Sequence, residues 1–173
     1  ASPEEIIFTA GATESTNFII KGYLDYRKFY GDGKNHVITS LVEHKATLNT
    51  CKYLNGELYS NNDPTISLFG EKKRVNRGFE ASFVGVTPNG EINIEDIALK
   101  IKENTALVSI LYVNNEIGTI SDVEAVSALC RNNNIAFHSD LTQALGKMQI
   151  DIKKIVDTTF HAIVQNQWTT TER

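Results

Sequence analysis

Four short segments of the sequence carry side chains that can bind or transform a ligand, and each follows a run of apolar residues. The first, residues 9–15, combines small residues and hydroxyls around Thr13 and opens a helical pattern. Free backbone N–H groups at such a turn, together with the helix dipole, favour binding of a phosphate. The alternative is that Thr13 or Ser15 caps the helix and binds no ligand.

The other three segments place a ring, an amide pair and a carboxylate after later apolar runs. His44 follows residues 36–40, and its ring either stacks on a flat aromatic ligand or forms hydrogen bonds within a loop. The pair Asn114 and Asn115 either donates to a ligand oxygen or ties down its own loop. Asp140 ends another apolar run and needs a partner, which is either the following turn or a protonated ring nitrogen.

The elements that must position these residues alternate between strand-like and helix-like patterns. We expect strands at residues 6–10, 36–40, 81–87, 107–113 and 135–138, helices at 14–30, 45–54, 94–103 and 122–132, and a helical turn at 151–155. This alternation predicts an α/β fold of βαβ units with right-handed crossovers and a mainly parallel sheet. Ligands of such sheets bind beyond the carboxyl ends of the strands, which is where all four segments fall.

Together the four segments offer an anion cradle, a flat ring, an amide donor and a carboxylate at one edge of one sheet. Pyridoxal phosphate needs this set, because its phosphate is anchored, its ring is stacked, its phenolate oxygen accepts a hydrogen bond and its pyridinium nitrogen pairs with an acid. The sequence therefore predicts a pyridoxal phosphate site, although each segment taken alone favours the structural alternative.

Composition narrows the class of protein. The 173 residues include 17 basic and 21 acidic side chains, for a formal net charge of −4, and 41% are hydrophobic. These values are ordinary for a globular protein, and the chain has no apolar run long enough to span a membrane. The mild acidity argues against nucleic acid as a partner.

Cysteine is scarce, and its positions matter for both compartment and chemistry. Cys51 and Cys130 lie far apart in the sequence, and neither belongs to a Cys/His pattern with the spacing of metal ligands. We therefore expect no metal site, no disulfide and two buried free thiols. This usage, and a chain that shows no targeting segment, predicts a cytoplasmic or other reducing compartment.

Two segments depart from the alternating pattern. Residues 60–79 are polar and contain a basic cluster at 72–77, and we expect a surface insertion there. Residues 165–173 lack apolar periodicity and predict a disordered tail. The remainder, residues 1–164, is predicted to form one partial domain.

The order of these motifs resembles that of the cysteine desulfurases, the NifS/IscS-like group of class V aminotransferases, which are fold-type I pyridoxal phosphate enzymes. The matching text is Gly11-Ala12-Thr13-Glu14-Ser15, Glu43-His44-Lys45-Ala46, Val113-Asn114-Asn115-Glu116-Ile117-Gly118 and His138-Ser139-Asp140 with Thr142-Gln143. Order and spacing hold from about residue 4 to 157, apart from the insertion. The resemblance implies part of the family's large cofactor-binding domain, with a three-layer α/β/α fold, and a homodimer.

The resemblance also implies a role for each matching position. Thr13 and the residue before it would hold the phosphate, and His44 would stack on the pyridine ring and assist proton transfer as a catalytic residue. Asn115 would contact the substrate carboxylate or the phenolate oxygen, and Asp140 would keep the pyridine nitrogen protonated. A glutamine three residues later would donate to the phenolate oxygen. The expected cofactor-binding set is Ala12, Thr13, His44, Asn115, Asp140 and Gln143.

The chain departs from the family pattern where the covalent anchor of the cofactor is expected. The family carries Ser-x-Ser-Gly-His-Lys there, whereas this sequence continues from Asp157 into residues 158–165 without a lysine, and none follows Lys154. The family's C-terminal domain, whose mobile loop carries the cysteine that takes the substrate sulfur, is also unmatched. The two cysteines of this chain match ordinary helical positions of the family.

Two functions of different classes therefore stay open. The first is a desulfurase-like domain that binds pyridoxal phosphate without a covalent bond and has little or no activity alone. Its parent reaction converts L-cysteine to L-alanine and delivers the sulfur as a persulfide to an acceptor that the sequence does not identify. The second is a non-enzymatic remnant or interaction module that keeps the sheet and binds no cofactor. The text from Thr158 onward also fits a fragment or an altered reading frame.

Overall fold

The computed structural model describes residues 6–57, 75–151 and 155, and the backbone of residues 161–164. Its centre is a five-stranded sheet in the order β2-β1-β3-β4-β5, in which every neighbouring pair is parallel. The strands are β1 (His36–Ser40), β2 (Glu80–Val84), β3 (Thr105–Ser109), β4 (Ala136–Asp140) and β5 (His161–Val164). The prediction of a parallel sheet is confirmed.

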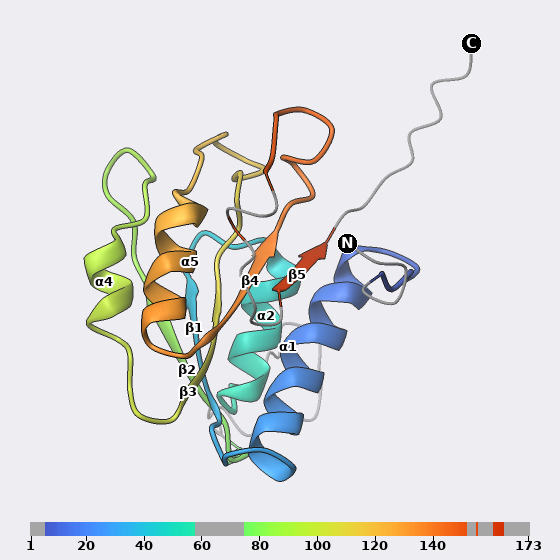
Figure 1. Cartoon of the computed structure of the whole chain (residues 1–173), viewed down its shortest axis with the longest axis vertical. Coiled ribbons are helices and arrows are strands. Elements are labelled where there is room, and N and C mark those ends of the chain that lie inside the picture. Colours follow the sequence, from blue (N-terminus) through green and yellow to red (C-terminus); the bar gives the residue numbers. More distant parts are fainter. Residues whose placement is uncertain (1–5, 58–74, 152–154, 156–160, 165–173) are drawn as a thin grey trace, which may run out of the picture.

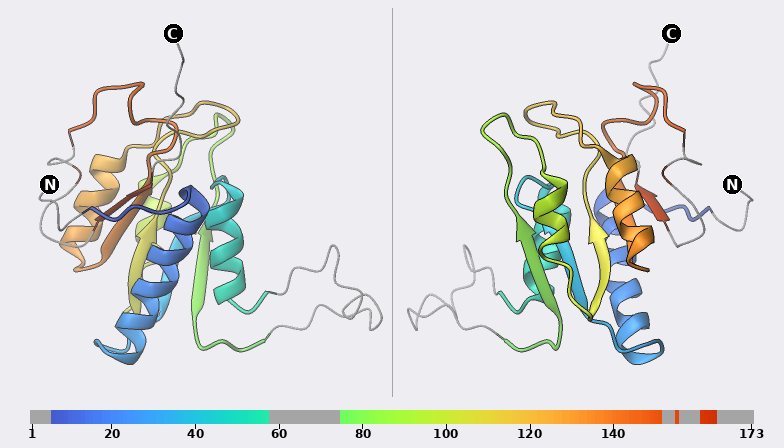
Figure 2. Two further views of the ribbon diagram at one scale, coloured as in Figure 1. Left: turned by 90° about the vertical axis from the view of Figure 1, so that its right-hand side faces the viewer. Right: turned by 60° about the vertical axis from the view of Figure 1, so that its left-hand side comes forward.

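Helices cover both faces of the sheet and give the three expected layers (Figures 1 and 2). The helices α1 (Ala12–Phe29) and α2 (Lys45–Leu54) pack on one face, and α4 (Ile94–Ala98) and α5 (Val123–Asn132) pack on the other. Adjacent strand residues are therefore both buried, as in other parallel sheets. Val37 packs in the core cluster shared with α1 and α2, whereas Ile38 packs in the cluster shared with α4 and α5.

The starts of α1 and α2 differ in how they are capped. His44 is the N-cap of α2, and its Nδ1 accepts a hydrogen bond from the Ala46 amide at 3.2 Å. The N-cap of α1 is Gly11, which has no side chain to accept from the first amides. The alternative in which Thr13 or Ser15 caps this helix is wrong, because α1 begins before both residues.

The apolar run at residues 6–10 is not a strand, contrary to the prediction. Ile6, Ile7 and Phe8 are exposed, and no strand of the described chain pairs with this run. An apolar run becomes a strand only where a partner strand offers hydrogen bonds and a face to pack against. Here the run lies on the surface and leads into α1.

Three other elements are shorter than predicted. The strand expected at 81–87 is β2, which ends at Val84 before a turn in which the Gly90 amide donates to the Thr87 carbonyl. The strand expected at 107–113 is β3, which ends at Ser109 because the amide of Leu111 donates to a side chain instead of to β1. The helix expected at 94–103 is α4, which ends at Ala98.

The elements predicted at 14–30, 36–40, 45–54, 122–132 and 135–138 agree with the structure to within two residues, whereas β5 was not predicted. Residues 152–154 of the predicted turn, most of the insertion at 60–79 and the tail at 165–173 lie outside the described residues. The described end of the insertion is attached to the domain, since Phe79 packs against the cluster of α1 and α2. Among the described residues, no helix combines the length and the apolar composition that crossing a membrane requires.

Candidate functional site

The candidate residues lie on loops and helix starts at one edge of the sheet, the upper edge in Figure 1. Because all strands are parallel, their carboxyl ends meet at this edge. β1 leads to His44, β3 leads to the loop that holds Asn115, and β4 ends in Asp140. The first turn of α1, with Ala12 and Thr13, lies at the same edge.

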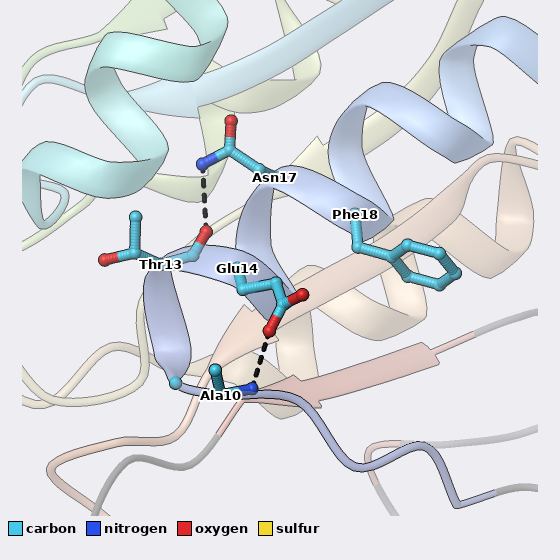
Figure 3. Close-up of a pocket in the computed structure, with 6 residues that line it drawn as sticks. Ala10, Thr13, Glu14, Asn17 and Phe18 are labelled. Atoms are coloured by element: carbon cyan, nitrogen blue, oxygen red, sulfur yellow. Dashed lines mark hydrogen bonds between the residues drawn. The ribbon is translucent and has the colours of Figure 1, made fainter.

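The first turn of α1 borders an open hollow of about 670 Å³ (Figure 3). Thr13 is exposed beside it, and Glu14 turns back to accept a hydrogen bond from the Ala10 amide at 2.6 Å. Since Gly11 provides no capping side chain, the amides of the first turn are available to an anion at a positive helix end. Binding of a phosphate by these amides stays a prediction.

Asn17 links this turn to the helix that follows His44. Its Nδ2 donates to the Thr13 carbonyl at 2.9 Å, and its Oδ1 accepts from Thr50 Oγ1 of α2 at 3.0 Å. The candidate phosphate turn is therefore held against α2 by a polar bridge as well as by apolar packing. Asn17 is not among the cofactor-binding residues that the sequence predicts.

Asp140 is only 8% exposed at the end of β4. Its Oδ1 accepts the amide of Thr142 at 2.9 Å, so the predicted alternative of a turn cap is correct. Within the described chain, Oδ2 accepts no hydrogen bond, which leaves one oxygen of a nearly buried carboxyl for a ligand N–H. A buried carboxyl without a full set of partners is costly, and a cationic ring nitrogen would satisfy it.

The other candidates offer a ring, an amide and a further donor. His44 is exposed, with one ring nitrogen used as the α2 cap, so the face of its ring is open. Asn115 is exposed on the loop after β3. Gln143 Oε1 accepts from Lys147 Nζ at 2.6 Å, which leaves the Gln143 amide nitrogen to donate to an anionic oxygen. The ligand contacts of these residues stay predictions.

Glu43 and Asn114 are two buried polar residues at this edge, and only Glu43 was missed as a functional candidate. Glu43 Oε1 accepts from Ser40 Oγ at 2.7 Å and from the Leu111 amide at 3.0 Å. Burial raises the pKa of Glu43 to about 8, and the nearby charge of Asp140 acts in the same direction. The second residue, Asn114, ties down its loop, as one predicted alternative for the asparagine pair states. The signal for Glu43 was available, because the argument that a carboxyl after an apolar run needs partners applies to Glu43 as well as to Asp140.

A buried histidine lies beneath Asp140 on the same strand. His138 is 1% exposed, its Nδ1 lies 2.8 Å from Ser109 Oγ, and its Nε2 has no partner among the described residues. Burial lowers the pKa of His138 to about 4, against the opposing effect of the Asp140 charge. His138 is therefore neutral at pH 7 and provides no positive charge next to Asp140.

The two thiols are not candidates for sulfur chemistry in this structure. Both are buried and free, as predicted. Burial raises the pKa of the Cys51 thiol well above its ordinary value and that of Cys130 to about 12. Since the thiolate is the reactive form, neither group is an effective nucleophile at neutral pH.

Comparison with models of known protein families shows to which family the chain belongs. The model of the class-V aminotransferase family matches residues 1–59 and 68–160. The chain belongs to this family. Class-V aminotransferases depend on pyridoxal phosphate, and the residues at the sheet edge fit that group: an uncapped helix start for its phosphate, an open ring for its face and a buried carboxyl oxygen for its nitrogen.

Individual relatives in the class-V family are cysteine desulfurases and NifS-like proteins. The chain is 44% identical over 155 residues to cysteine desulfurase IscS of Buchnera aphidicola subsp. Baizongia pistaciae, covering 90% of this chain and 33% of that protein. It is 40% identical over 152 residues to the IscS of Plasmodium falciparum, covering 88% of this chain and 24% of that protein. The chain thus spans a third or less of these two relatives.

Two solved structures share the fold of this chain. SspA in complex with cysteine superimposes with a TM-score of 0.75 at 32% identity, over 95% of this chain and 40% of the SspA chain. A NifS-like protein superimposes with a TM-score of 0.72 at 32% identity, over 95% of this chain and 39% of the other. The three-layer α/β fold implied by the resemblance is therefore confirmed.

Proposed function

We propose that the chain forms the pyridoxal phosphate-binding part of a cysteine desulfurase, whose reaction converts L-cysteine to L-alanine and passes the sulfur on as a persulfide. The observation that carries this proposal is the nearly buried carboxyl of Asp140 at the carboxyl end of β4, with one oxygen engaged and one open. Asp140 and the uncapped start of α1 lie at the same edge of the sheet, which supports a ligand that has both an anionic and a cationic end.

Each residue then has a role in binding and orienting the cofactor. The first-turn amides of α1, with Thr13, bind the phosphate, and Asp140 holds a proton at the pyridine nitrogen. His44 packs its open ring on the pyridine ring, and Gln143 donates to the phenolate oxygen. When bound, pyridoxal phosphate supplies an electron sink that stabilises negative charge on the substrate's α-carbon.

The choice of cysteine as the substrate rests on the relatives. The IscS proteins are cysteine desulfurases, and SspA was solved in complex with cysteine. Because the chain has no lysine after Lys154 and its two thiols are buried, we propose that it binds the cofactor without a covalent bond and turns over little or no cysteine alone.

Titration with pyridoxal phosphate tests the proposal. We expect a shift of the cofactor's absorption band and quenching of the fluorescence of Trp168 and the tyrosines, saturating at one cofactor per chain. After borohydride treatment and denaturation, the cofactor should separate from the chain. Unchanged absorption and fluorescence at millimolar cofactor would contradict cofactor binding and favour the non-enzymatic alternative.

Removal of the His44 ring should weaken cofactor binding without unfolding α2. In His44→Asn the new side chain still caps the helix, because asparagine is a good N-cap residue, but the stacking surface is gone. Since a stacked pair of rings contributes about 0.5–1.5 kcal/mol, we expect about a 2- to 10-fold loss of affinity. Equal affinity of the variant and the wild type, measured by fluorescence titration, would remove His44 from the site.

A further inference from the structure

The loops that follow β1 and β3 are joined by two hydrogen bonds, both donated by the loop after β3 and accepted by the loop after β1. Glu43, after β1, accepts the amide of Leu111, after β3, at 3.0 Å. Asn114, after β3, donates from Nδ2 to the carbonyl of Val42, after β1, at 2.9 Å. Each loop thus uses a side chain to hold the backbone of the other. We call Glu43 and Asn114, with these two bonds, the clasp.

Both side chains of the clasp are buried and anchored on their own loop as well. Glu43 is 6% exposed and also accepts from Ser40 Oγ at 2.7 Å. Asn114 is 7% exposed, and its Oδ1 accepts the amides of Glu116 and Ile117 at 2.8 and 3.0 Å. A buried side chain with several hydrogen bonds has one well-defined position, so the clasp fixes the two loops relative to each other.

The clasp lies next to the candidate ligand-binding residues but does not include them. His44 follows Glu43 directly, and Asn115 follows Asn114 directly. Both of these residues are exposed, whereas their clasp neighbours are buried. A buried residue with a fixed position limits the movement of the exposed residue next to it, and this keeps a ligand-binding side chain in place.

We propose that Glu43 and Asn114 are positioning residues that hold His44 and Asn115 at a fixed separation across the ligand-binding edge. This inference rests on the proposed function for its ligand, but the clasp itself is a property of the chain alone. Neither residue is expected to touch the cofactor.

The charge state of Glu43 suits this role. The charged and titratable groups that act on Glu43 are Asp140 of β4 and Cys51 of α2, and neither of them is a cation. Because burial raises the pKa of Glu43 to about 8, its carboxyl is neutral at pH 7, and in this state Oε1 still accepts two hydrogen bonds. Glutamine has the same shape, the same acceptor oxygen and no charge, so Glu43→Gln should preserve the clasp.

Amide hydrogen exchange in the cofactor-free chain tests the clasp without any ligand. In Glu43→Ala we expect the Leu111 amide to exchange at least tenfold faster, and in Glu43→Gln we expect it to exchange at the wild-type rate. Asn114→Ala should also speed exchange at Leu111, although the acceptor of that amide is intact, because the clasp acts as a unit. The matched control is Glu91→Ala, which removes an exposed glutamate from another loop at this edge. A Leu111 rate unchanged by Asn114→Ala would overturn the proposal, and if Glu43→Ala does not fold, Asn114→Ala and Glu43→Gln decide it.

Binding of two ligands separates positioning from general destabilisation. We expect Asn114→Ala to lower the affinity for pyridoxal phosphate about tenfold and to leave the affinity for inorganic phosphate, which α1 alone would hold, unchanged within twofold. Equal losses for both ligands, or no loss for either, would overturn the positioning role. If the wild type binds no pyridoxal phosphate, the proposed function fails and the positioning role fails with it, whereas the exchange rates still decide whether the clasp exists.

Discussion

Asp140→Asn should lower the affinity of the chain for pyridoxal phosphate by about 10- to 100-fold. Asparagine keeps an oxygen for the Thr142 amide, so the turn after β4 stays intact and only the charge is lost. A hydrogen bond to a charged group contributes about 1.5–3 kcal/mol, which corresponds to this range of affinity. Fluorescence titration of the wild type and the variant under identical buffer conditions measures the ratio.

The matched control for this variant is Asp25→Asn, which removes an exposed carboxylate in the C-terminal half of α1. It changes the net charge by the same amount and should leave the affinity unchanged. Wild-type affinity in Asp140→Asn would show that the carboxyl does not meet the cofactor nitrogen. An equal loss in both variants would show that overall charge, rather than a specific contact, controls binding.

The chain should lose stability as the pH falls from about 6.5 to 4, and His138 should account for about 3 kcal/mol of that loss. The pKa of His138 is about 4 in the folded chain and 6.5 when unfolded, so the unfolded chain takes up its proton first. The stabilisation is complete above pH 6.5 and is lost as the pH falls through the folded pKa. Urea unfolding at several pH values measures this slope.

A second buried histidine acts in the same direction at the opposite edge of the sheet. His36 bridges three strands, with Nδ1 2.8 Å from Thr105 Oγ1 and Nε2 2.9 Å from Ser82 Oγ, and burial lowers its pKa to about 4. Glu43 opposes both histidines, because its raised pKa makes the chain less stable as the pH rises from 4.5 to about 8. Because these groups have opposing effects, the pH dependence of the wild type alone does not isolate the contribution of His138. That contribution is measured as the difference in the free energy of unfolding between a single variant and the wild type.

The comparison uses His138→Asn, whose side chain still reaches Ser109 but does not titrate. We expect the free energy of unfolding of this variant to depend less on pH between 6.5 and 4 than that of the wild type. His44→Asn, the same substitution at an exposed ring, serves as the control. If the two variants have the same dependence, the buried His138 ring is not the source of the acid sensitivity.

Helices and strands whose identifying sequence pattern lies within the element itself were predictable from the sequence. The β1 run at 36–40 and the helix at 45–54 were both predicted with their observed bounds, because an apolar run and a following helical pattern are separated by polar residues. The three-layer arrangement follows from strands whose successive residues are both apolar, since each face then needs a cover of helices.

The run at residues 6–10 shows where local reasoning fails. Its composition is that of a buried strand, yet Phe8 is 91% exposed. Whether such a run forms a strand depends on a partner elsewhere in the chain, and composition does not contain that information. The early end of β3 has a similar cause, because a distant side chain, Glu43, takes the amide of Leu111.

The candidate site was predicted residue by residue, but its supports were not. The position of Asp140 at the end of β4 followed from the strand pattern, whereas the hydrogen bonds of Glu43 and Asn114 join loops that are about 70 residues apart in the chain. Contacts between residues so far apart in the sequence depend on the register of β1 against β3, and this register is known only from the structure.

The strand order has a consequence for how the chain is made. β1 lies inside the sheet between β2 and β3, yet it leaves the ribosome before either of them. Both of its edges lack their native neighbours until residue 84 has been synthesised, and the edge that β3 covers stays open until residue 109, so β1 can pair with other nascent chains in that interval. Formation of the sheet is therefore delayed until β3 has been synthesised, and a molecular chaperone that shields β1 in the meantime would raise the yield of native protein.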